Sequence, residues 1–550
     1  MPKNKTEIKS DGHRWFMIII LCLFGILYLT ANNDDIKQKE KKQKVYLIHA
    51  DEGRIDRKNL PDVQILVGNV KLRHDSMYMY CDSALVYEKT NSVRAFNNVR
   101  MEQGDTLFIY SDLLYYSGET QIAELRHNVR LINKATELTT DSLNYDRYLN
   151  LGYYFAGGTL IDGDNVLTSE WGEYSPVTKV SSFNHDVKLT NPKYVLNSDT
   201  LRYNTDTKIA NILGPSNIVS DDNNIYSERG YYNTLTDVAE LLDRSVLTNK
   251  EKTMTGDSLY YDRKKGYGEA FYNIEMVDFK SKHMLVGDYC FYNEKTDYAF
   301  ATDKAVAIDY SQKDSLYMHA DTLKLISYNL KTDSLYREMR AYHKVRIYRL
   351  DIQGACDSLL YNSKDSCMTM YKDPVLWNNN QQLLGEEIKI FMKDSTINKV
   401  HIANQALAVE QLDSITYNQI SGKDMYSFFE NGEMKRVEVQ GNVLVRFYPI
   451  ENDGSFIGFN VGEGSLLHIY IKDRKMDKGM FIGPANGVMY PMEQIPSDKL
   501  KLPSFVWLDY IRPKSRNDIF NWIGKKEDET IKPTRTTRVK KDKRKLIDMR

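Results

Sequence analysis

The sequence is poor in proline and cysteine and has no excess of charge of either sign. Thirteen prolines among 550 residues exclude a Pro-rich disordered chain. The formal net charge of −1 gives no general attraction for a polyanion, so nucleic acid is not an expected partner. No HExxH, GxSxG or phosphate-binding glycine loop occurs, and the ten histidines are scattered. We therefore expect neither an enzyme nor a bound cofactor.

The five cysteines predict no metal centre, because none forms a CxxC pair or accompanies a histidine cluster. Cys22 lies in an apolar run without the small residues of a lipoprotein signal, so we do not expect it to be lipidated. Cys356 and Cys367 are near enough in the sequence to suggest a disulfide. A hairpin centred on residues 362–365 would instead place Cys356 opposite Tyr371, which makes the disulfide the less favoured alternative.

What the chain has in quantity is length and aromatic residues. A chain of 550 residues exceeds one ordinary compact core, which predicts either several domains or an elongated repeat array. Aromatic residues make up 11% of the chain, and 39 of them are tyrosines. Tyrosine, valine, isoleucine and threonine favour strands, because their flat or β-branched side chains suit a pleated, half-buried surface. The composition therefore favours an all-β protein.

The N-terminus predicts a protein that works outside the cytoplasm. A basic segment, residues 1–14, precedes an apolar run at 15–31, which is the order found in secretory signal peptides and membrane anchors. The run has about 17 residues, the lower limit for spanning a bilayer. Cleavage after Ala31 would leave Leu29 where a small residue is preferred, which slightly favours an uncleaved anchor. Residues 32–44 follow as a charged linker.

A short motif, Asp-Ser/Thr-Leu-x-Tyr or a relative, recurs at intervals of about 29 residues. A second motif, typified by Gly-Asn-Val-Lys-Leu, lies between its copies. Two interleaved motifs with one period predict a repeat array. The first motif begins at Asp82, Asp112, Asp141, Asp199, Asp257, Asp288, Asp321 and Asp357, with weaker copies at Ser169 and Ser227. The second occupies residues 68–72, 97–101, 127–131, 185–189, 343–347 and 441–445.

Each repeat alternates with period two, which is typical of a strand with one buried face. From Ala123 to Leu131 the odd-numbered residues, His127 among them, share the apolar face. Short turns between the strands imply antiparallel pairing. Each repeat is therefore predicted to be two strands that bury their apolar face only by stacking on neighbours. The two ends of such a stack would be open edges that can pair with another strand.

The repeated aspartate has two interpretations. A calcium site is one, but calcium-binding β-rolls use glycine-rich nine-residue repeats that are absent here. We instead expect the aspartate and the following Ser or Thr to bond nearby backbone groups where a strand begins.

The apolar strand faces also have two interpretations, a closed core or a groove that accepts acyl chains. A folded sheet could be core at its crease and groove at its mouth. The apolar face continues through successive repeats, which favours the groove. The candidate groove residues are Val70, Leu72, Val99, Met101, Leu125, Val129, Leu131, Leu143, Tyr145, Val187, Leu189, Leu259 and Tyr261. We expect Arg100, Arg126, Arg130 and Asn144 to face water.

The C-terminal part departs from the repeat. Residues 396–512 are predicted to be a divergent β region, with short helical turns near 495–525. Residues 513–550 are predicted to be a basic, disordered tail, since 530–550 carries nine Lys or Arg against two Asp. Attraction of this tail to anionic lipid headgroups is the functional alternative.

The paired motifs resemble the OstA-like family, named for organic solvent tolerance, which includes the LptA-type lipopolysaccharide transport proteins. Residues 82–101 show the family pattern, with Asn97 in place of a glycine. The resemblance covers residues 45–395, the predicted β-repeat domain. It is weak over 396–512, although 495–515 looks like the C-terminal part of long OstA-like proteins of Bacteroidetes-type bacteria.

The resemblance implies an all-β, elongated β-jelly roll, or β-taco, whose hydrophobic groove shields lipid A acyl chains in the periplasm. The implied partners are lipopolysaccharide or a related lipid, and other envelope transport proteins that meet the open sheet edges. The large number of repeats leaves two hypotheses open. The chain could conduct lipid between the two membranes, or it could be a scaffold for outer-membrane assembly without conduction.

Overall fold

The computed structural model describes residues 44–220, 223–248, 250–393, 396–430, 432–451, 453–473 and 475–531. The predicted basic segment 1–14, the apolar run 15–31 and nearly all of the linker lie outside these residues, as does the tail from 532 onward. Within the described ranges, no helix has both the length and the apolar character needed to cross a membrane.

The described chain is almost entirely strand, which confirms the all-β prediction. Thirty-seven strands form one antiparallel sheet, and the chain divides into two compact units, residues 1–134 with 139–152 and residues 135–138 with 153–550. The strands of the first unit are β1 (Tyr46–His49), β2 (Glu52–Ile55), β3 (Val63–His74), β4 (Met77–Tyr87), β5 (Ser92–Gln103), β6 (Leu107–Ser117) and β7 (Ile122–Asn133). Residues of β8 (Thr136–Asp146) and β9 (Leu151–Tyr154) fall in both units.

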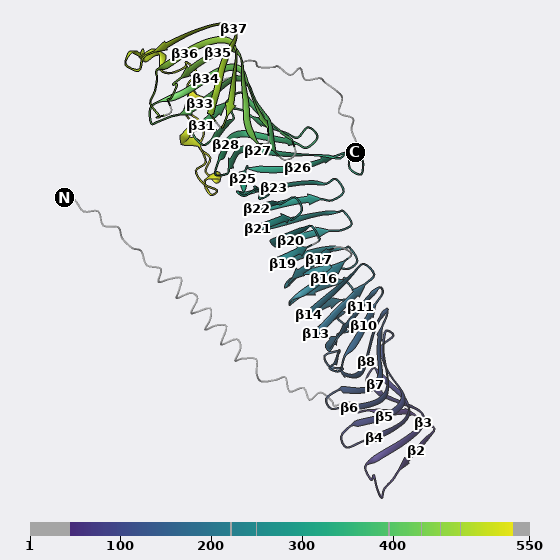
Figure 1. Cartoon of the computed structure of the whole chain (residues 1–550). Coiled ribbons are helices and arrows are strands. Elements are labelled where there is room, and N and C mark those ends of the chain that lie inside the picture. The colour runs from purple at the N-terminus through teal and green to yellow at the C-terminus, as the bar shows by residue number, and fades with distance from the viewer. Residues whose placement is uncertain are drawn as a thin grey trace, which may run out of the picture. The chain divides into compact units, whose positions relative to one another are not determined.

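In the second unit the strands follow one another in chain order (Figure 1). Its strands up to residue 309 are β10 (Gly158–Asp162), β11 (Asn165–Ser169), β12 (Trp171–Tyr174), β13 (Val180–Asn191), β14 (Tyr194–Asn204), β15 (Ile209–Ile212), β16 (Ser216–Ser220), β17 (Asn223–Ser227), β18 (Arg229–Asn233), β19 (Val238–Thr248), β20 (Lys252–Asp262), β21 (Tyr267–Asp278), β22 (His283–Asn293), β23 (Tyr298–Thr302) and β24 (Val306–Asp309). They continue with β25 (Leu316–His319), β26 (Thr322–Tyr328), β27 (Tyr336–Tyr348), β28 (Ile352–Asn362), β29 (Cys367–Tyr371), β30 (Val375–Asn378), β31 (Gln381–Leu384), β32 (Glu387–Lys393), β33 (Thr396–Gln411), β34 (Tyr417–Glu430), β35 (Glu433–Phe447), β36 (Phe459–Lys472) and β37 (Lys475–Tyr490).

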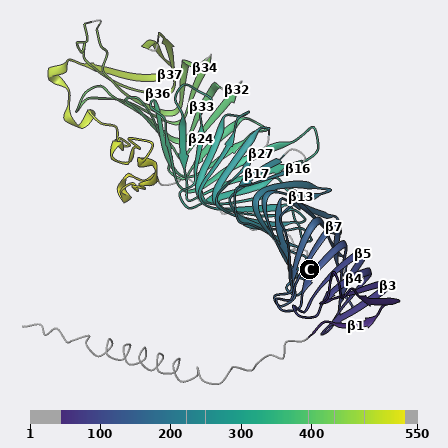
Figure 2. The same cartoon turned by 90° about the horizontal axis from the view of Figure 1, so that it is seen from below.

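The second sequence motif forms a corner within each long strand. In β5, Asn97 and Asn98 both have positive φ, 60° and 47°, and the register with β4 shifts at this point. Asparagine and glycine tolerate this left-handed conformation better than other residues, which explains why the motif carries them. The corner divides β5 into residues 92–96 and 99–103, and the strand ribbons curve accordingly (Figure 2). Pairs at 127–128, 185–186 and 272–273 repeat the same conformation.

The corners give each unit two arms. The first arm consists of the half-strands that end at turns such as 88–91 and 118–121. The second arm consists of the half-strands that end at turns such as 75–76 and 104–106. Antiparallel pairing continues along both arms from strand to strand. The apolar faces of the two arms are buried against the interior, as an alternating pattern requires.

The prediction for the repeated aspartate is wrong in its position and its partner. Asp112 lies in the middle of β6, not where a strand begins. Its carboxylate accepts a hydrogen bond of 2.7 Å from the side-chain amide of Asn128, at the corner of the next strand. Asn98 donates to Asp82 in the same way, over 2.8 Å. The two sequence motifs therefore recur together, since aspartates such as Asp82, Asp112 and Asp257 bind the neighbouring corner.

The prediction that His127 lies on the apolar face is also wrong. His127 and Asn128 both belong to a corner and are exposed, whereas Leu125 and Val129 on either side are buried. The extra residue of the bulge carries the histidine to the outside without disturbing the alternation beyond it.

The four described cysteines, Cys81, Cys290, Cys356 and Cys367, are buried and free, so the disulfide considered above does not form. Tyr371 lies opposite Ser358, and Cys367 lies opposite Asn362.

A C-terminal segment, residues 496–531, lies on the outer side of the second arm, and we call it the strap. Leu502 and Leu508 of the strap pack in one cluster with Trp377 and Leu384. The strap includes residues 513–531, which the sequence assigns to the tail. Short 3-10 turns occur where they are predicted, at Met492–Gln494, Ser497–Lys499, Asp509–Ile511, Asp518–Phe520 and Glu527–Glu529.

Candidate functional site

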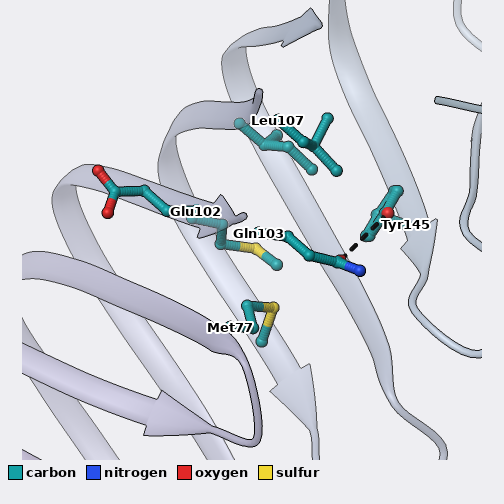
Figure 3. Close-up of a pocket in the computed structure, with 7 residues that line it drawn as sticks. Met77, Glu102, Gln103, Leu107 and Tyr145 are labelled. Atoms are coloured by element: carbon teal, nitrogen blue, oxygen red, sulfur yellow. Dashed lines mark hydrogen bonds between the residues drawn. The ribbon is translucent and has the colours of Figure 1, made fainter. Parts of the chain in front are cut away.

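Most candidate groove residues are completely buried between the arms. Eleven of the thirteen are at most 2% exposed, whereas Leu259 is 7% exposed and Tyr261 is half-buried. In the first unit Met77, Met101 and Leu107 line one small space. Gln103 reaches toward Tyr145, whose hydroxyl donates to the Gln103 side chain (Figure 3). No water-sized space remains among them. These eleven are Val70, Leu72, Val99, Met101, Leu125, Val129, Leu131, Leu143, Tyr145, Val187 and Leu189.

One inner row runs along the second arm, with one residue from each strand opposite the next. In the first unit its members are 0–2% exposed: Leu72, Met79, Met101, Ile109 and Leu131. In the second unit it begins equally buried, at Leu160, Leu167, Leu189 and Leu196. The row then becomes half-buried at Ile225, Leu247, Met254, Met276, Leu285 and Ala307. Met318 and Ile347 return to 5% exposed.

The tyrosine that ends the first sequence motif forms a matching row on the first arm. Tyr116 and Tyr145 are 0% and 1% exposed in the first unit. In the second unit the exposed fraction rises from 0% at Tyr203 through 8% at Tyr232 to 37% at Tyr292. Burial raises the pKa of Tyr145 to about 12. The same residue type at the same repeat position therefore passes from core to surface.

In the first unit, polar side chains at the tips of the two arms bond to each other. His74 Nδ1, at the tip of the second arm, is hydrogen-bonded to the Tyr116 hydroxyl over 2.5 Å. Arg147, in a first-arm turn, donates to Tyr116 and is paired with Asp75 over 3.5 Å. Since His74 and Arg147 are only 2% and 8% exposed, these bonds hold the arms together away from water.

Comparable links join the arms in the second unit. The buried carboxylate of Asp162, on the second arm, accepts a hydrogen bond of 2.7 Å from the Tyr203 hydroxyl and one of 2.6 Å from Lys208 Nζ. Lys193, in a second-arm turn, donates a hydrogen bond of 2.8 Å to Asp237, in a first-arm turn. Burial alone raises the pKa of Asp237, but the hydrogen bonds from Lys193 and Tyr232 and the charge of Lys193 together hold it below its ordinary value. Because these links join their two arms, we call strands β3–β18 the tied strands.

The links end before residues 252–309, which we call the open stretch. Its inner tyrosines bond within their own arm: Tyr261 donates to Glu294 over 3.1 Å, and Tyr292 donates to Asp297 over 3.4 Å. Among the described residues 253–309, no hydrogen bond or ion pair joins the two arms. The candidate groove residues predicted from the sequence do not reflect this difference, although Ala270 and Ala301 of the open stretch stand where the tied strands carry Leu125 and Phe183.

The polar faces behave largely as predicted. Arg130 is exposed, and its guanidinium lies 5.9 Å from the centre of the Tyr110 ring. Arg100, Arg126 and Asn144 are half-buried on the outer face, where Arg126 donates to Asn144 over 2.9 Å. Within the part of the chain that the structure describes, no cluster of His, Cys, Asp or Glu could hold a metal ion.

Comparison with known families identifies these repeats. Residues 42–199 and 203–316 match the model of the OstA-like protein family. The chain belongs to the OstA-like family. A search of curated proteins finds no match to this OstA-like chain. The family is one of transport and binding proteins of the cell envelope, related to the movement of lipopolysaccharide and other lipids. The matched residues take in the tied strands and the open stretch and end at the first residue of β25.

Proposed function

We propose that this OstA-like protein carries lipopolysaccharide or a related lipid between the inner and outer membranes, with the acyl chains held between its two arms. No catalytic step is involved. The observation that carries the proposal is the inner row of apolar residues, which continues from strand to strand and becomes half-buried in the open stretch. An apolar row that solvent reaches is the feature that distinguishes a lipid site from a core.

The energetics of such a site need no specific pocket. Each methylene of an acyl chain removed from water contributes ~0.8 kcal/mol. A chain that lies along Met254, Met276 and Leu285 would cover side chains from three strands at once. The free energy would then come from contact length, which a repeat architecture supplies.

A second candidate function is favoured by the tied strands. From β3 to β16 their interior is filled by buried side chains, so this part behaves as a core. A chain that was closed throughout would be a scaffold for outer-membrane assembly. We propose conduction or carriage for the open stretch and a supporting role for the tied strands.

We propose a periplasmic location, with residues 15–31 acting as an inner-membrane anchor or as a cleaved signal. The basic-then-apolar order of the N-terminus supports this, and so does membership of an envelope family. Protease added to spheroplasts with intact inner membranes should digest residues 45–550. Complete protection of those residues would contradict the proposal.

We also propose that other envelope transport proteins pair with the free sheet edges. β37 pairs with β36, and its exposed apolar residues include Val488 and Met489, at 52% each. A long exposed edge with apolar side chains is suited to accept another strand.

The direct test is lipid retention by the full-length protein. The wild-type protein, extracted gently from cells that make lipopolysaccharide, should co-purify with lipid that mass spectrometry identifies. Arg130→Asp is the control variant. Because Arg130 faces water, this substitution should leave lipid retention unchanged. A folded wild-type protein that repeatedly retains no lipid would favour the scaffold function instead.

A further inference from the structure

We infer that lipid is held specifically in the open stretch, residues 252–309, and that its headgroup there is anionic. The inference rests on the proposed function and adds to it the place and the charge of the ligand. The inner row of the second arm is half-buried from Ile225 and Leu247 through these strands, and the tyrosine row of the first arm loses its burial within them. Two independent rows, one on each arm, are therefore both accessible in the open stretch.

The residue types explain why the interior is not filled there. Several inner positions carry smaller side chains than the same repeat positions of the tied strands. Ala270 and Ala301 stand where the tied strands carry Leu125 and Phe183, and Ala307 stands where they carry Leu131. Small side chains leave volume between two sheets that larger ones would occupy. Met254, Met276 and Leu285 supply flexible apolar contacts beside that space.

The open stretch also lies between two stabilising features of the second unit. The last links between the arms reach Asp237 from Lys193 and Thr234 from Asn165. The strap contacts the second arm from β25 onward, where the rings of His319 and Phe520 are 4.8 Å apart. Among residues 253–309 neither feature occurs, so the arms there are the least restrained against separation.

Two turns that border the open stretch are basic, whereas the first-arm turn 294–297 carries Glu294 and Asp297 beside Lys295. Arg263, Lys264 and Lys265 follow one another in a first-arm turn, and Lys280 and Lys282 lie in a second-arm turn. Lys280 is paired with Glu251 over 2.9 Å, whereas Arg263 and Lys282 form no ion pair within the described residues. Cations at the border of an apolar site complement phosphate or carboxylate groups on a lipid headgroup.

The test is photo-crosslinking from the full-length protein in cells that make lipopolysaccharide. A photoreactive phenylalanine analogue replaces Tyr261 or Tyr292 in the open stretch, and Tyr116 or Tyr203 in the tied strands. Tyr260 is a further control, because it neighbours Tyr261 on the same strand but points to the outer face. It keeps the comparison interpretable even if the buried positions do not tolerate the analogue.

We expect lipid crosslinks from Tyr261 and Tyr292 and none from Tyr260, Tyr116 or Tyr203. Equal crosslinking from the tied strands would overturn the inference and leave the proposed function standing. Capture of a protein instead of lipid at Tyr292 would overturn it as well. Absence of lipid at every position, in a folded protein, would reject the inference together with the proposed function.

The headgroup charge is tested by reversing two cations. Arg263→Glu with Lys282→Glu should lower lipid crosslinking from Tyr292 by roughly tenfold or more, because each basic residue near an anionic surface contributes to binding. Lys188→Glu with Arg202→Glu makes the same charge change on exposed outer positions and should have no effect. Equal crosslinking by both double variants would show that the charge of the lipid headgroup does not contribute to its binding.

Discussion

The tied strands and the open stretch are built from the same repeat, yet only one of them has a filled interior. Both have the corner, the aspartate that binds it and the inner tyrosine. They differ in what the tyrosine hydroxyl meets. Tyr203 bonds to Asp162 on the opposite arm, whereas Tyr261 bonds to Glu294 on its own arm. A repeat can therefore be core or binding surface according to a few residues at the tips of its arms.

The comparison is tested most strongly by placing a charge on the inner row of each part. Leu131→Asp, at a position that is 0% exposed, should unfold the protein or lower its stability by about 4 kcal/mol or more, because the cavity and an unpaired buried charge add. Leu285→Asp, at a half-buried position, should leave the fold intact and reduce lipid retention. Melting temperature and co-purified lipid are measured on the same samples.

If Leu285→Asp unfolds the protein as severely as Leu131→Asp does, the open stretch is core and the comparison fails. Val129→Asp should behave like Leu131→Asp, since Val129 is 1% exposed. Arg130→Asp reports the effect of a charge change on the outer face of the same strand.

Breaking a link between the arms should have the next largest effect. Asp162→Ala removes the acceptor for both Tyr203 and Lys208, and we expect a loss of about 3 kcal/mol. The arms should also separate there, so amide hydrogen exchange should quicken around Tyr203. Asp164→Ala, in the exposed turn just beyond, is the matched control and should change neither property. Unchanged exchange in Asp162→Ala would mean that packing alone closes the tied strands.

The strap defines the far limit of the open stretch, and it is held by buried glutamines. Gln382 is 0% exposed. Its side chain donates a hydrogen bond of 2.8 Å to the carbonyl of Val506 and accepts one of 2.7 Å from the amide of Leu508. Gln382→Ala would leave both backbone groups without a partner, at a cost of about 2 kcal/mol. Limited proteolysis should then cut the strap sooner. Gln381→Ala, at the exposed neighbouring position, should resemble wild type.

The parts of the fold that depend on neighbouring residues could be predicted from the sequence. The repeat period, the strands and the buried inner residues such as Val129 and Leu143 follow from alternation and spacing. The corner was present in the Gly-Asn-Val motif, but the sequence did not show that its two residues would turn His127 outward. The local pattern does not reveal the partner of the aspartate, because that partner lies on another strand, 16 residues away.

The parts that depend on distant pairing could not be predicted. His74 and Tyr116 are 42 residues apart, and Gln382 and Val506 are 124 apart. Nothing in the local pattern connects such residues, because their approach is set by the position of whole arms or of the strap. For the same reason the sequence could list candidate groove residues but could not separate buried Leu131 from half-buried Leu285.

A smaller effect is expected from acid at the boundary of the tied strands. The pKa of Asp237 lies below its ordinary value in the folded protein, so its link stabilises the fold above the unfolded pKa of about 3.9. That contribution is lost as the pH falls through the lower, folded pKa. Urea unfolding of wild type should therefore approach that of Asp237→Asn only below about pH 4. A difference between the two proteins that stays constant from pH 7 to pH 3 would contradict this.

The smallest effect concerns a feature that both parts share, and it should not distinguish them. Asn128 in the tied strands donates 2.7 Å to Asp112, and Asn273 in the open stretch donates 2.6 Å to Asp257. Both bonds are exposed, so Asn128→Ala and Asn273→Ala should each cost about 1 kcal/mol, from the lost bond and the positive φ. Glycine at either position should recover the part that comes from φ, because it adopts this conformation without strain. Chemical unfolding of the four variants measures these costs. Asn273→Ala could prove much more destabilising than Asn128→Ala. The corner would then contribute more to stability in the open stretch, where links between the arms are absent among residues 253–309. The two parts would differ at the corner as well as at the tips of the arms.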